Sequence, residues 1–132
     1  MKFLVCGLGS IGRRHLRHLA AQGEHDIVLY RTGKSTLPDD DLAGYPVETD
    51  LAAALAAQPD GVIIANPTAL HIDVAIPAAQ AGCHILLEKP ISHDLARVSD
   101  LQAAAQASGS RMLVGFQFRH HPAFAAIKAL IV

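Results

Sequence analysis

Short apolar runs alternate with segments of helical period along almost the whole 132-residue chain. Apolar runs of this kind are typical of parallel strands that are buried on both faces of a sheet. A helix that joins two such strands forms a right-handed crossover, so the alternation predicts an α/β doubly wound parallel sheet in a single domain. Strands are expected over residues 2–6, 26–30, 46–48, 61–65, 83–87 and 111–115, and helices over residues 10–23, 50–58, 70–80, 92–109 and 121–132.

The ends of the predicted helices carry their own signals. Asp50 and Ser92 are expected to cap the helices that they precede, and Gly109 is expected to lie just beyond the end of the fourth helix. Pro77 should kink or split the third helix, because proline cannot donate the internal hydrogen bond. Residues 33–45 are rich in turn formers and should be a loop with a short helix around residues 39–43.

Composition and charge bound the possible partners. The 11 basic and 12 acidic residues leave a net charge of −1, which gives no electrostatic reason to bind nucleic acid or an anionic membrane. The apolar runs are much shorter than a bilayer crossing requires, and the opening MKFLVCGLGS has the pattern of a strand, not of a secretion signal. We therefore expect a cytoplasmic protein with neither nucleic acid nor membrane as partner.

Two cysteines and eight histidines are candidates for redox or metal chemistry. Six such strands would match a dinucleotide-binding fold with the strand order 3-2-1-4-5-6. In that order, Cys6 and Cys83 lie two strand spacings apart, roughly 9 to 10 Å. That separation exceeds the reach of a disulfide bond, so both thiols are expected to be free in a reducing compartment. His15 and His18 share a helix face but have no third ligand near them in sequence, so no metal site is predicted.

The run GLGSIG places Gly7, Gly9 and Gly12 between the first predicted strand and the first predicted helix. This is the context of the dinucleotide-binding loop of a Rossmann fold. There the three glycines allow a tight turn, the approach of a pyrophosphate to the backbone, and close packing of the helix. The N–H groups of Ser10 and Ile11 would meet the phosphate. The alternative is a tight turn without a ligand.

The end of the second strand bears on the choice of cofactor. Enzymes that prefer NAD place an acidic residue there, whereas a nearby arginine suits the 2′-phosphate of NADP. This chain has Arg31 followed by Thr32. The pattern favours NADP(H) over NAD(H) and argues against an S-adenosylmethionine site, and the alternative is a solvated loop with incidental charge.

The stretch HILLEKPISH places Glu88, Lys89 and Pro90 at the carboxyl end of the fifth predicted strand. Ligands of doubly wound sheets bind at this edge. Proline disfavours helical geometry for the residue before it, so Pro90 should keep Lys89 at the edge of the sheet. Glu88 can pair with the lysine or orient it, and Lys89 becomes the candidate for proton transfer. The alternative is a surface ion pair at a strand end.

Four stretches together resemble a known family: GLGSIGRRH at 7–15, ANPTALH at 65–71, AGCHILLEKPIS at 81–92 and VGFQFRHHP at 114–122. In this order and spacing they are similar to the Gfo/Idh/MocA oxidoreductases, named after glucose–fructose oxidoreductase and inositol dehydrogenase. The resemblance covers the whole chain. It implies an NAD(P)-dependent dehydrogenase or reductase of sugars, cyclitols or related polyols.

The resemblance also implies roles for individual residues. Lys89 matches the lysine that contacts both the nicotinamide ribose and the reacting hydroxyl. Asn66, Pro67 and Thr68 fall where the family has a Thr-Pro-Asn motif, and since the residue types at positions 66 and 68 differ from it, cofactor contact is expected through the backbone. His71 matches the histidine after that motif, with a helix-start hydrogen bond as the alternative. Arg119 would lie near a domain hinge or be structural.

The domain organisation follows from the same resemblance. Residues 1–119 would form the dinucleotide-binding domain, and residues 120–132 would begin a helix that leads to a second domain absent from this chain. That domain binds the substrate and makes the homo-oligomer interface in the family, so the chain alone is expected to be inactive. The competing interpretation is a non-catalytic sensor that binds a dinucleotide. A nucleic-acid function through RRHLRH is disfavoured by the net charge.

Overall fold

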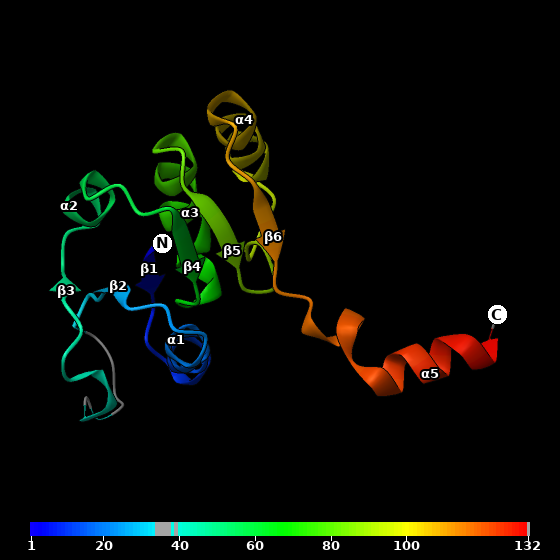
Figure 1. Cartoon of the computed structure of the whole chain (residues 1–132). Helices are drawn as coiled ribbons and strands as arrows, with labels where there is room; N and C mark the ends of the chain where they lie inside the picture. Colours follow the sequence, from blue (N-terminus) through cyan, green and yellow to red (C-terminus); the bar gives the residue numbers. More distant parts are fainter. Residues whose placement is uncertain (34–37, 39, 132) are drawn as a thin grey trace.

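A six-stranded parallel sheet forms the centre of the computed structural model, which describes residues 1–33, 38 and 40–131 (Figure 1). The strand order is β3-β2-β1-β4-β5-β6, and every neighbouring pair is parallel. This confirms the predicted doubly wound topology. The strands are β1 (Lys2–Cys6), β2 (Asp26–Tyr30), β3 (Val47–Glu48), β4 (Gly61–Ile64), β5 (His84–Leu87) and β6 (Met112–Val114).

The register brings the carboxyl ends of the strands to one edge of the sheet. Cys6 pairs with both Tyr30 and Ile64, and Leu87 pairs with both Ile64 and Val114. The residues that follow these strand ends therefore meet at the same edge, although they are far apart in sequence. This edge holds all of the predicted site.

Within the described residues, five α-helices connect or follow the strands, together with three short 3₁₀ turns. None of the helices in the described part of the chain combines the length and the apolar character needed to cross a membrane. The helices are α1 (Ser10–Ala21), α2 (Leu51–Ala56), α3 (His71–Gln80), α4 (Val98–Ser108) and α5 (Pro122–Ile131), and the turns are η1 (Asp40–Leu42), η2 (Thr68–Leu70) and η3 (Gln117–His120).

Two of the predicted helix ends are confirmed. The Asp50 carboxylate accepts a hydrogen bond from the N–H of Ala52 at 3.0 Å and so caps α2. Gly109 closes α4 in the left-handed conformation at φ 74°, where a side chain would be strained. η1 lies within the predicted short helix around residues 39–43, of which residue 39 falls outside the described residues, as do residues 34–37 of the predicted loop.

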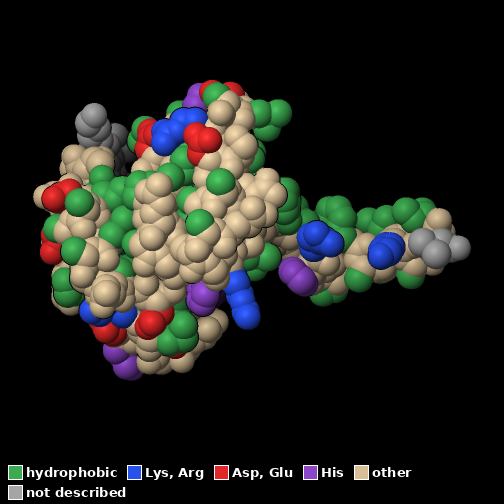
Figure 2. All heavy atoms as spheres, turned by 90° about the horizontal axis from the view of Figure 1, so that it is seen from above, with side chains coloured by type: hydrophobic (Ala, Val, Ile, Leu, Met, Phe, Trp, Pro, Cys, Tyr) green, Lys and Arg blue, Asp and Glu red, His purple; other side chains and the backbone are tan. Residues whose placement is uncertain are grey.

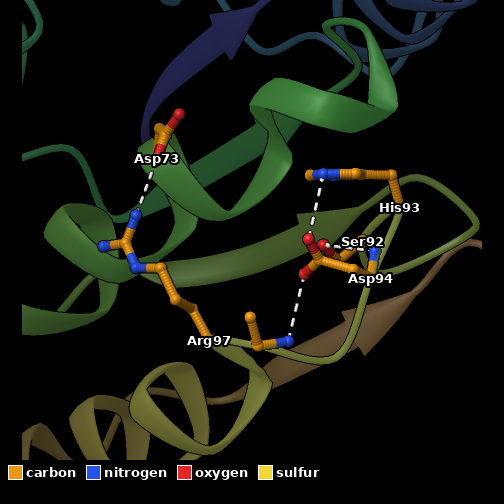
Figure 3. A network of polar contacts seen from close by, with 6 residues as sticks. Asp73, Ser92, His93, Asp94 and Arg97 are labelled. Atoms are coloured by element: carbon orange, nitrogen blue, oxygen red, sulfur yellow. Dashed lines mark hydrogen bonds and ion pairs between the residues drawn. The ribbon is translucent and has the colours of Figure 1, made fainter.

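The prediction for Ser92 is wrong. Helix α4 begins at Val98, and residues 92–97 form turns in which polar side chains bind nearby backbone groups (Figure 3). The Asp94 carboxylate accepts from the N–H of Ala96 at 3.0 Å and also pairs with His93, so it offers the backbone an alternative to the helix. An ion pair of 2.7 Å between Arg97 and Asp73 ties this segment to α3. Of the two outcomes expected for Pro77, a kink or a split of α3, the split does not occur, since the helix continues through the proline.

The hydrophobic core has one layer on each face of the sheet. On one face, Leu4 and Cys6 of β1 join a cluster with α2, α3 and α4. On the other face, Val5 joins a smaller cluster with Leu16 of α1. Successive residues of a strand point to opposite faces, which explains why neighbours in β1 enter different clusters. Helix α5 instead projects from the rounded body as an arm (Figure 2), and Phe124, Ile127 and Leu130 on it are exposed.

Both cysteines are free and buried, as predicted. Burial, with a smaller contribution from the nearby Cys83 thiol, raises the pKa of Cys6 far above its ordinary value. Burial also raises the pKa of Cys83. The folded chain therefore keeps both protons at a pH at which an unfolded chain would lose them.

This difference predicts a loss of stability in alkaline solution. Above about pH 8.5, where an exposed thiol ionises, the unfolded state binds fewer protons than the folded state, so the free energy of unfolding falls. For one thiol the slope approaches about 1.4 kcal/mol per pH unit. Urea unfolding of the unmodified chain and of Cys6→Ala between neutral pH and about pH 10 should show a shallower fall for the variant. Equal slopes would contradict the assignment.

Candidate functional site

A cavity of about 480 Å³ opens at the carboxyl edge of the sheet. The loops after β1, β2 and β4 form its walls. Eight of the predicted cofactor-binding residues line it: Gly7, Gly9, Ser10, Ile11, Arg31, Thr32, Asn66 and Pro67. Five lining residues were not predicted, because nothing in their type marks them as ligand contacts: Leu8, Tyr30, Gly33, Ala65 and Leu70.

The glycine loop is pressed against the neighbouring strand. Gly7 has φ +86°, and a Cβ atom built on it would lie 2.3 Å from the backbone nitrogen of Asn66. A Cβ atom on Gly12 would lie 1.8 Å from the carbonyl oxygen of Gly7. Neither position can hold a side chain without moving the backbone. Gly12 thus supports the loop from beneath and does not line the cavity.

Gly9 differs from both, because a Cβ atom on it would meet nothing within 4 Å. It lies at the cavity and is the N-cap of α1. Among the described residues no side chain caps this helix, and its first turn has no acidic residue. The partial positive charge of the helix N-terminus therefore suits an anion close to the backbone of Gly9, Ser10 and Ile11.

Arg13 connects the first turn of α1 to the glycine loop and to η1. It is buried, its Nε donates to the carbonyl of Leu8 at 2.8 Å, and its guanidinium pairs with Asp41 of η1. Sequence analysis did not identify this pair, because its partners are 28 residues apart. The pair holds η1 against the glycine loop.

At the end of β2, Arg31 and Thr32 line the cavity, and Tyr30 before them does so as well. The backbone N–H of Arg31 donates to the carbonyl of Glu48 at 3.0 Å, which joins the ends of β2 and β3. None of the described residues lining this cavity is acidic.

His71 lies behind the cavity and not in it. Only 1% of the residue is exposed. Its Nε2 is 2.9 Å from the carbonyl oxygen of Asn66, and its Nδ1 is 2.9 Å from the carbonyl oxygen of Pro90. The side chain of Asn66 meanwhile donates to the carbonyl of Leu70 at 3.1 Å. His71 therefore connects the loop after β4 with the loop after β5.

Glu88 binds His15, a contact that the sequence pattern does not predict. Its Oε1 lies 2.7 Å from Nε2 of His15 on α1, and both side chains are largely buried. Gly115, after β6, provides the room, since a Cβ atom there would lie 3.1 Å from the same carboxylate oxygen. The partners are 73 residues apart, so only the fold reveals the pair.

Lys89 lines a second cavity of about 400 Å³, together with Phe116, Gln117, Phe118 and Arg119. The Lys89–Pro90 peptide bond is cis. Glu88 and Lys89 thus face different surroundings, although they are adjacent in sequence. Among the described residues, no group of three or more His, Cys, Asp or Glu side chains is arranged to hold a metal ion.

Comparison with known proteins agrees with this geometry. Residues 1–116 match the family model described as the GFO/IDH/MocA oxidoreductase family with an NAD-binding Rossmann fold. This chain belongs to the Gfo/Idh/MocA oxidoreductase family. The family was expected from the four stretches at 7–15, 65–71, 81–92 and 114–122, and the match confirms it.

Individual relatives are considerably longer than this chain. Over its full length the chain is 29% identical to myo-inositol dehydrogenase Hyg17 of Streptomyces leeuwenhoekii, and it covers 41% of that protein. It is 33% identical to UDP-N-acetylglucosamine 3-dehydrogenase of Acidithiobacillus ferrooxidans, with 93% of the chain matched to 39% of the relative. The WlbA dehydrogenase of Bordetella pertussis, solved with NADH and UDP-GlcNAcA, superimposes with a TM-score of 0.86 at 27% identity, covering 99% of this chain and 42% of that one.

Proposed function

We propose that this chain is the cofactor-binding domain of an NAD(P)(H)-dependent oxidoreductase that acts on a sugar, a cyclitol or a related polyol. One observation carries the proposal: the glycine loop, the uncapped N-terminus of α1 and the ends of β2 and β4 surround a single cavity. Its volume of about 480 Å³ lies within the range of small-molecule sites, roughly 300–1,000 Å³. The family match and the NADH in the related WlbA structure support the same assignment.

The residues present fit a dinucleotide. The open space beside Gly9 admits a pyrophosphate close to the backbone, and the N-terminus of α1 favours its charge. The half-exposed side chains of Ile11 and Leu70 offer apolar surface in the same cavity. We propose Gly7, Gly9, Ser10, Ile11 and Gly12 as the phosphate-binding loop, and Asn66, Pro67 and His71 as support for the nicotinamide half.

NADP(H) is the proposed cofactor, in preference to NAD(H). The cavity residues at the end of β2 are Tyr30, Arg31, Thr32 and Gly33, and none can accept a hydrogen bond from a ribose 2′-hydroxyl through a carboxylate. A guanidinium binds a phosphate through charge-assisted hydrogen bonds, so Arg31 suits the additional phosphate of NADP. Thr32 offers a hydroxyl donor beside it.

Lys89 is the proposed catalytic residue. A bound nicotinamide would supply or accept a hydride, and the change between alcohol and carbonyl also requires transfer of one proton. Lys89 lines the cavity beside the cofactor-binding edge, and its ammonium has no ion pair among the described residues. It can give a proton to the carbonyl oxygen in reduction, or its amine can take the hydroxyl proton in oxidation.

The proposed substrates follow from the relatives. Proteins similar to this chain include dehydrogenases of myo-inositol and of UDP-N-acetylglucosamine. Because the relatives are more than twice as long, we propose that α5 leads into a substrate domain that would also make a homo-oligomer interface. The alternative is a sensor that binds the dinucleotide without chemistry. A sensor has no need for a lysine held at the substrate side.

The first test is cofactor binding. Calorimetry with NADPH and NADH should detect binding to the folded, unmodified chain. Gly9→Val should leave the melting temperature nearly unchanged, because space is open around its Cβ position, but weaken binding at least tenfold by filling the space of the phosphate. Gly12→Ala is the contrasting variant and should lose stability, since its Cβ would overlap the Gly7 carbonyl. A folded chain that binds neither cofactor would exclude the proposed function.

The second test concerns the choice of cofactor. A hydrogen bond to a charged group is worth about 1.5 to 3 kcal/mol, so Arg31→Ala should weaken NADPH binding roughly ten- to hundredfold and leave NADH binding nearly unchanged. Arg111→Ala is the matched control for loss of a positive charge, because Arg111 precedes the amino end of β6, whereas the cavity lies at the carboxyl edge of the sheet. Equal losses for both cofactors would show that Arg31 does not bind the 2′-phosphate.

The third test addresses catalysis in the full-length protein, with myo-inositol and UDP-N-acetylglucosamine among the probe substrates. Lys89→Ala should lower kcat by about 10²- to 10⁴-fold, the usual contribution of a proton-transfer group, while the Kd for NADPH changes little. Full activity of Lys89→Ala would refute its catalytic role. Binding of NADPH without turnover of any polyol by the unmodified protein would favour the sensor.

A further inference from the structure

We propose that His15 and His71 are a pair of positioning residues that hold Lys89 at a fixed place relative to the cofactor cavity. The proposal rests on the proposed function, because it concerns how the catalytic lysine is placed. Lys89 itself is exposed and has no side-chain hydrogen bond or ion pair among the described residues. Its position therefore depends on the two residues beside it, Glu88 and Pro90.

His15 holds the residue before the lysine. The 2.7 Å contact between its Nε2 and Oε1 of Glu88 joins the end of β5 to α1. An imidazole N–H can donate to a carboxylate in the neutral or the charged ring, so the contact does not depend on the charge of His15. The other oxygen of Glu88 lies 3.4 Å from the backbone nitrogen of Lys89. Helix α1 is also the helix whose N-terminus faces the cavity.

His71 holds the residue after the lysine. The carbonyl of Pro90 lies 2.9 Å from its Nδ1, and the carbonyl of Asn66 lies 2.9 Å from its Nε2. A carbonyl oxygen only accepts hydrogen bonds, so a ring nitrogen binds its loop only when it carries a proton. Protonated Nδ1 binds the loop of Pro90, and protonated Nε2 binds the loop of Asn66. A ring that carries both protons binds both loops. The ring is buried, which excludes water as a competing partner.

The two histidines thus connect both neighbours of Lys89 to elements that line the cofactor cavity. His15 lies on the helix that follows the glycine loop, and His71 contacts the backbone of Asn66, which lines the cavity itself. Backbone hydrogen bonds hold the strand up to Glu88, whose N–H donates to the carbonyl of Ile64 at 2.9 Å. Beyond the strand end, the contacts of His15 with Glu88 and of His71 with Pro90 hold the residues on either side of Lys89.

Placement of this kind affects the chemical step more than binding. A displacement of about 1 Å in a reacting group can cost about 10²-fold in rate. In the full-length protein, His15→Ala should therefore lower kcat by 10- to 100-fold and change the Kd for NADPH less than threefold. His15→Gln keeps an N–H donor and should recover most of kcat. His18→Ala is the matched control, because the side chain of His18 is exposed one turn further along α1, and it should keep the activity of the unmodified protein.

A second measurement needs neither cofactor nor substrate. Lys89 is one of only four lysines in the chain, so labelling the lysines by ¹³C-methylation gives a simple NMR spectrum. The resonance that is absent from the spectrum of Lys89→Arg belongs to Lys89. His15→Ala and Glu88→Gln should each shift the Lys89 resonance, and the double variant should shift it no further than the larger single effect. The resonances of Lys2 and Lys128 should stay in place.

For His71 the unmodified protein itself provides the test, because a buried histidine cannot be assumed to tolerate replacement. The Nδ1–H of His71 should be visible by NMR, protected from exchange and coupled to the carbonyl of Pro90. A ring N–H that exchanges rapidly or couples to Asn66 alone, or a Lys89 resonance that does not respond to either His15→Ala or Glu88→Gln, would overturn the proposal. Failure of NADPH to bind would instead remove the proposed function and leave these NMR results standing.

Discussion

The contact between the glycine loop and the end of β4 sets the position of every other part of the site. Gly12 lies on the carbonyl of Gly7, and Gly7 lies on the backbone of Asn66, at distances that exclude any side chain. This brings α1 down onto the strand junction. His15 is three residues after Gly12 and so lies on the same face of the helix, which is the face that reaches Glu88. One close backbone approach thus directs both the helix N-terminus to the cavity and His15 to the end of β5.

The charges at this edge are distributed unequally, although the chain as a whole is nearly neutral. The helix N-terminus, Arg31 and Lys89 all contribute positive charge to the surfaces of the two cavities. Glu88 is the acidic residue nearest to Lys89 in sequence, and its carboxylate pairs with His15. The carboxylate is thereby kept away from the lysine ammonium, and the cavities present a surface suited to the phosphates of a dinucleotide.

Local sequence patterns were sufficient to predict the topology of the fold. They could not predict contacts between residues that are far apart in the sequence. The apolar runs and the glycine spacing predict the strands, the helices between them and the loop after β1, because period and turn chemistry are local properties. The strand order came from the dinucleotide-binding fold that this alternation matches. The same reasoning failed at Ser92, where hydrogen bonds of Asp94 and an ion pair from Arg97 to α3 replace the expected first turns of a helix. It also missed the contact of His15 with Glu88, because residues 73 positions apart leave no joint signal in one sequence.

The backbone contacts of the loop after β4 explain why this chain can have Asn66 and Thr68 in place of the Thr and Asn of the Thr-Pro-Asn pattern. The loop contributes its backbone: the carbonyl of Asn66 meets His71, and the backbone nitrogen of Asn66 lies against Gly7. The side chain of Asn66 only closes the loop onto Leu70. A change of residue type at positions 66 and 68 leaves these backbone contacts available. By contrast, the roles proposed for Arg31, Lys89, His15 and His71 depend on their side chains, so substitutions at these four positions should alter cofactor choice or catalysis.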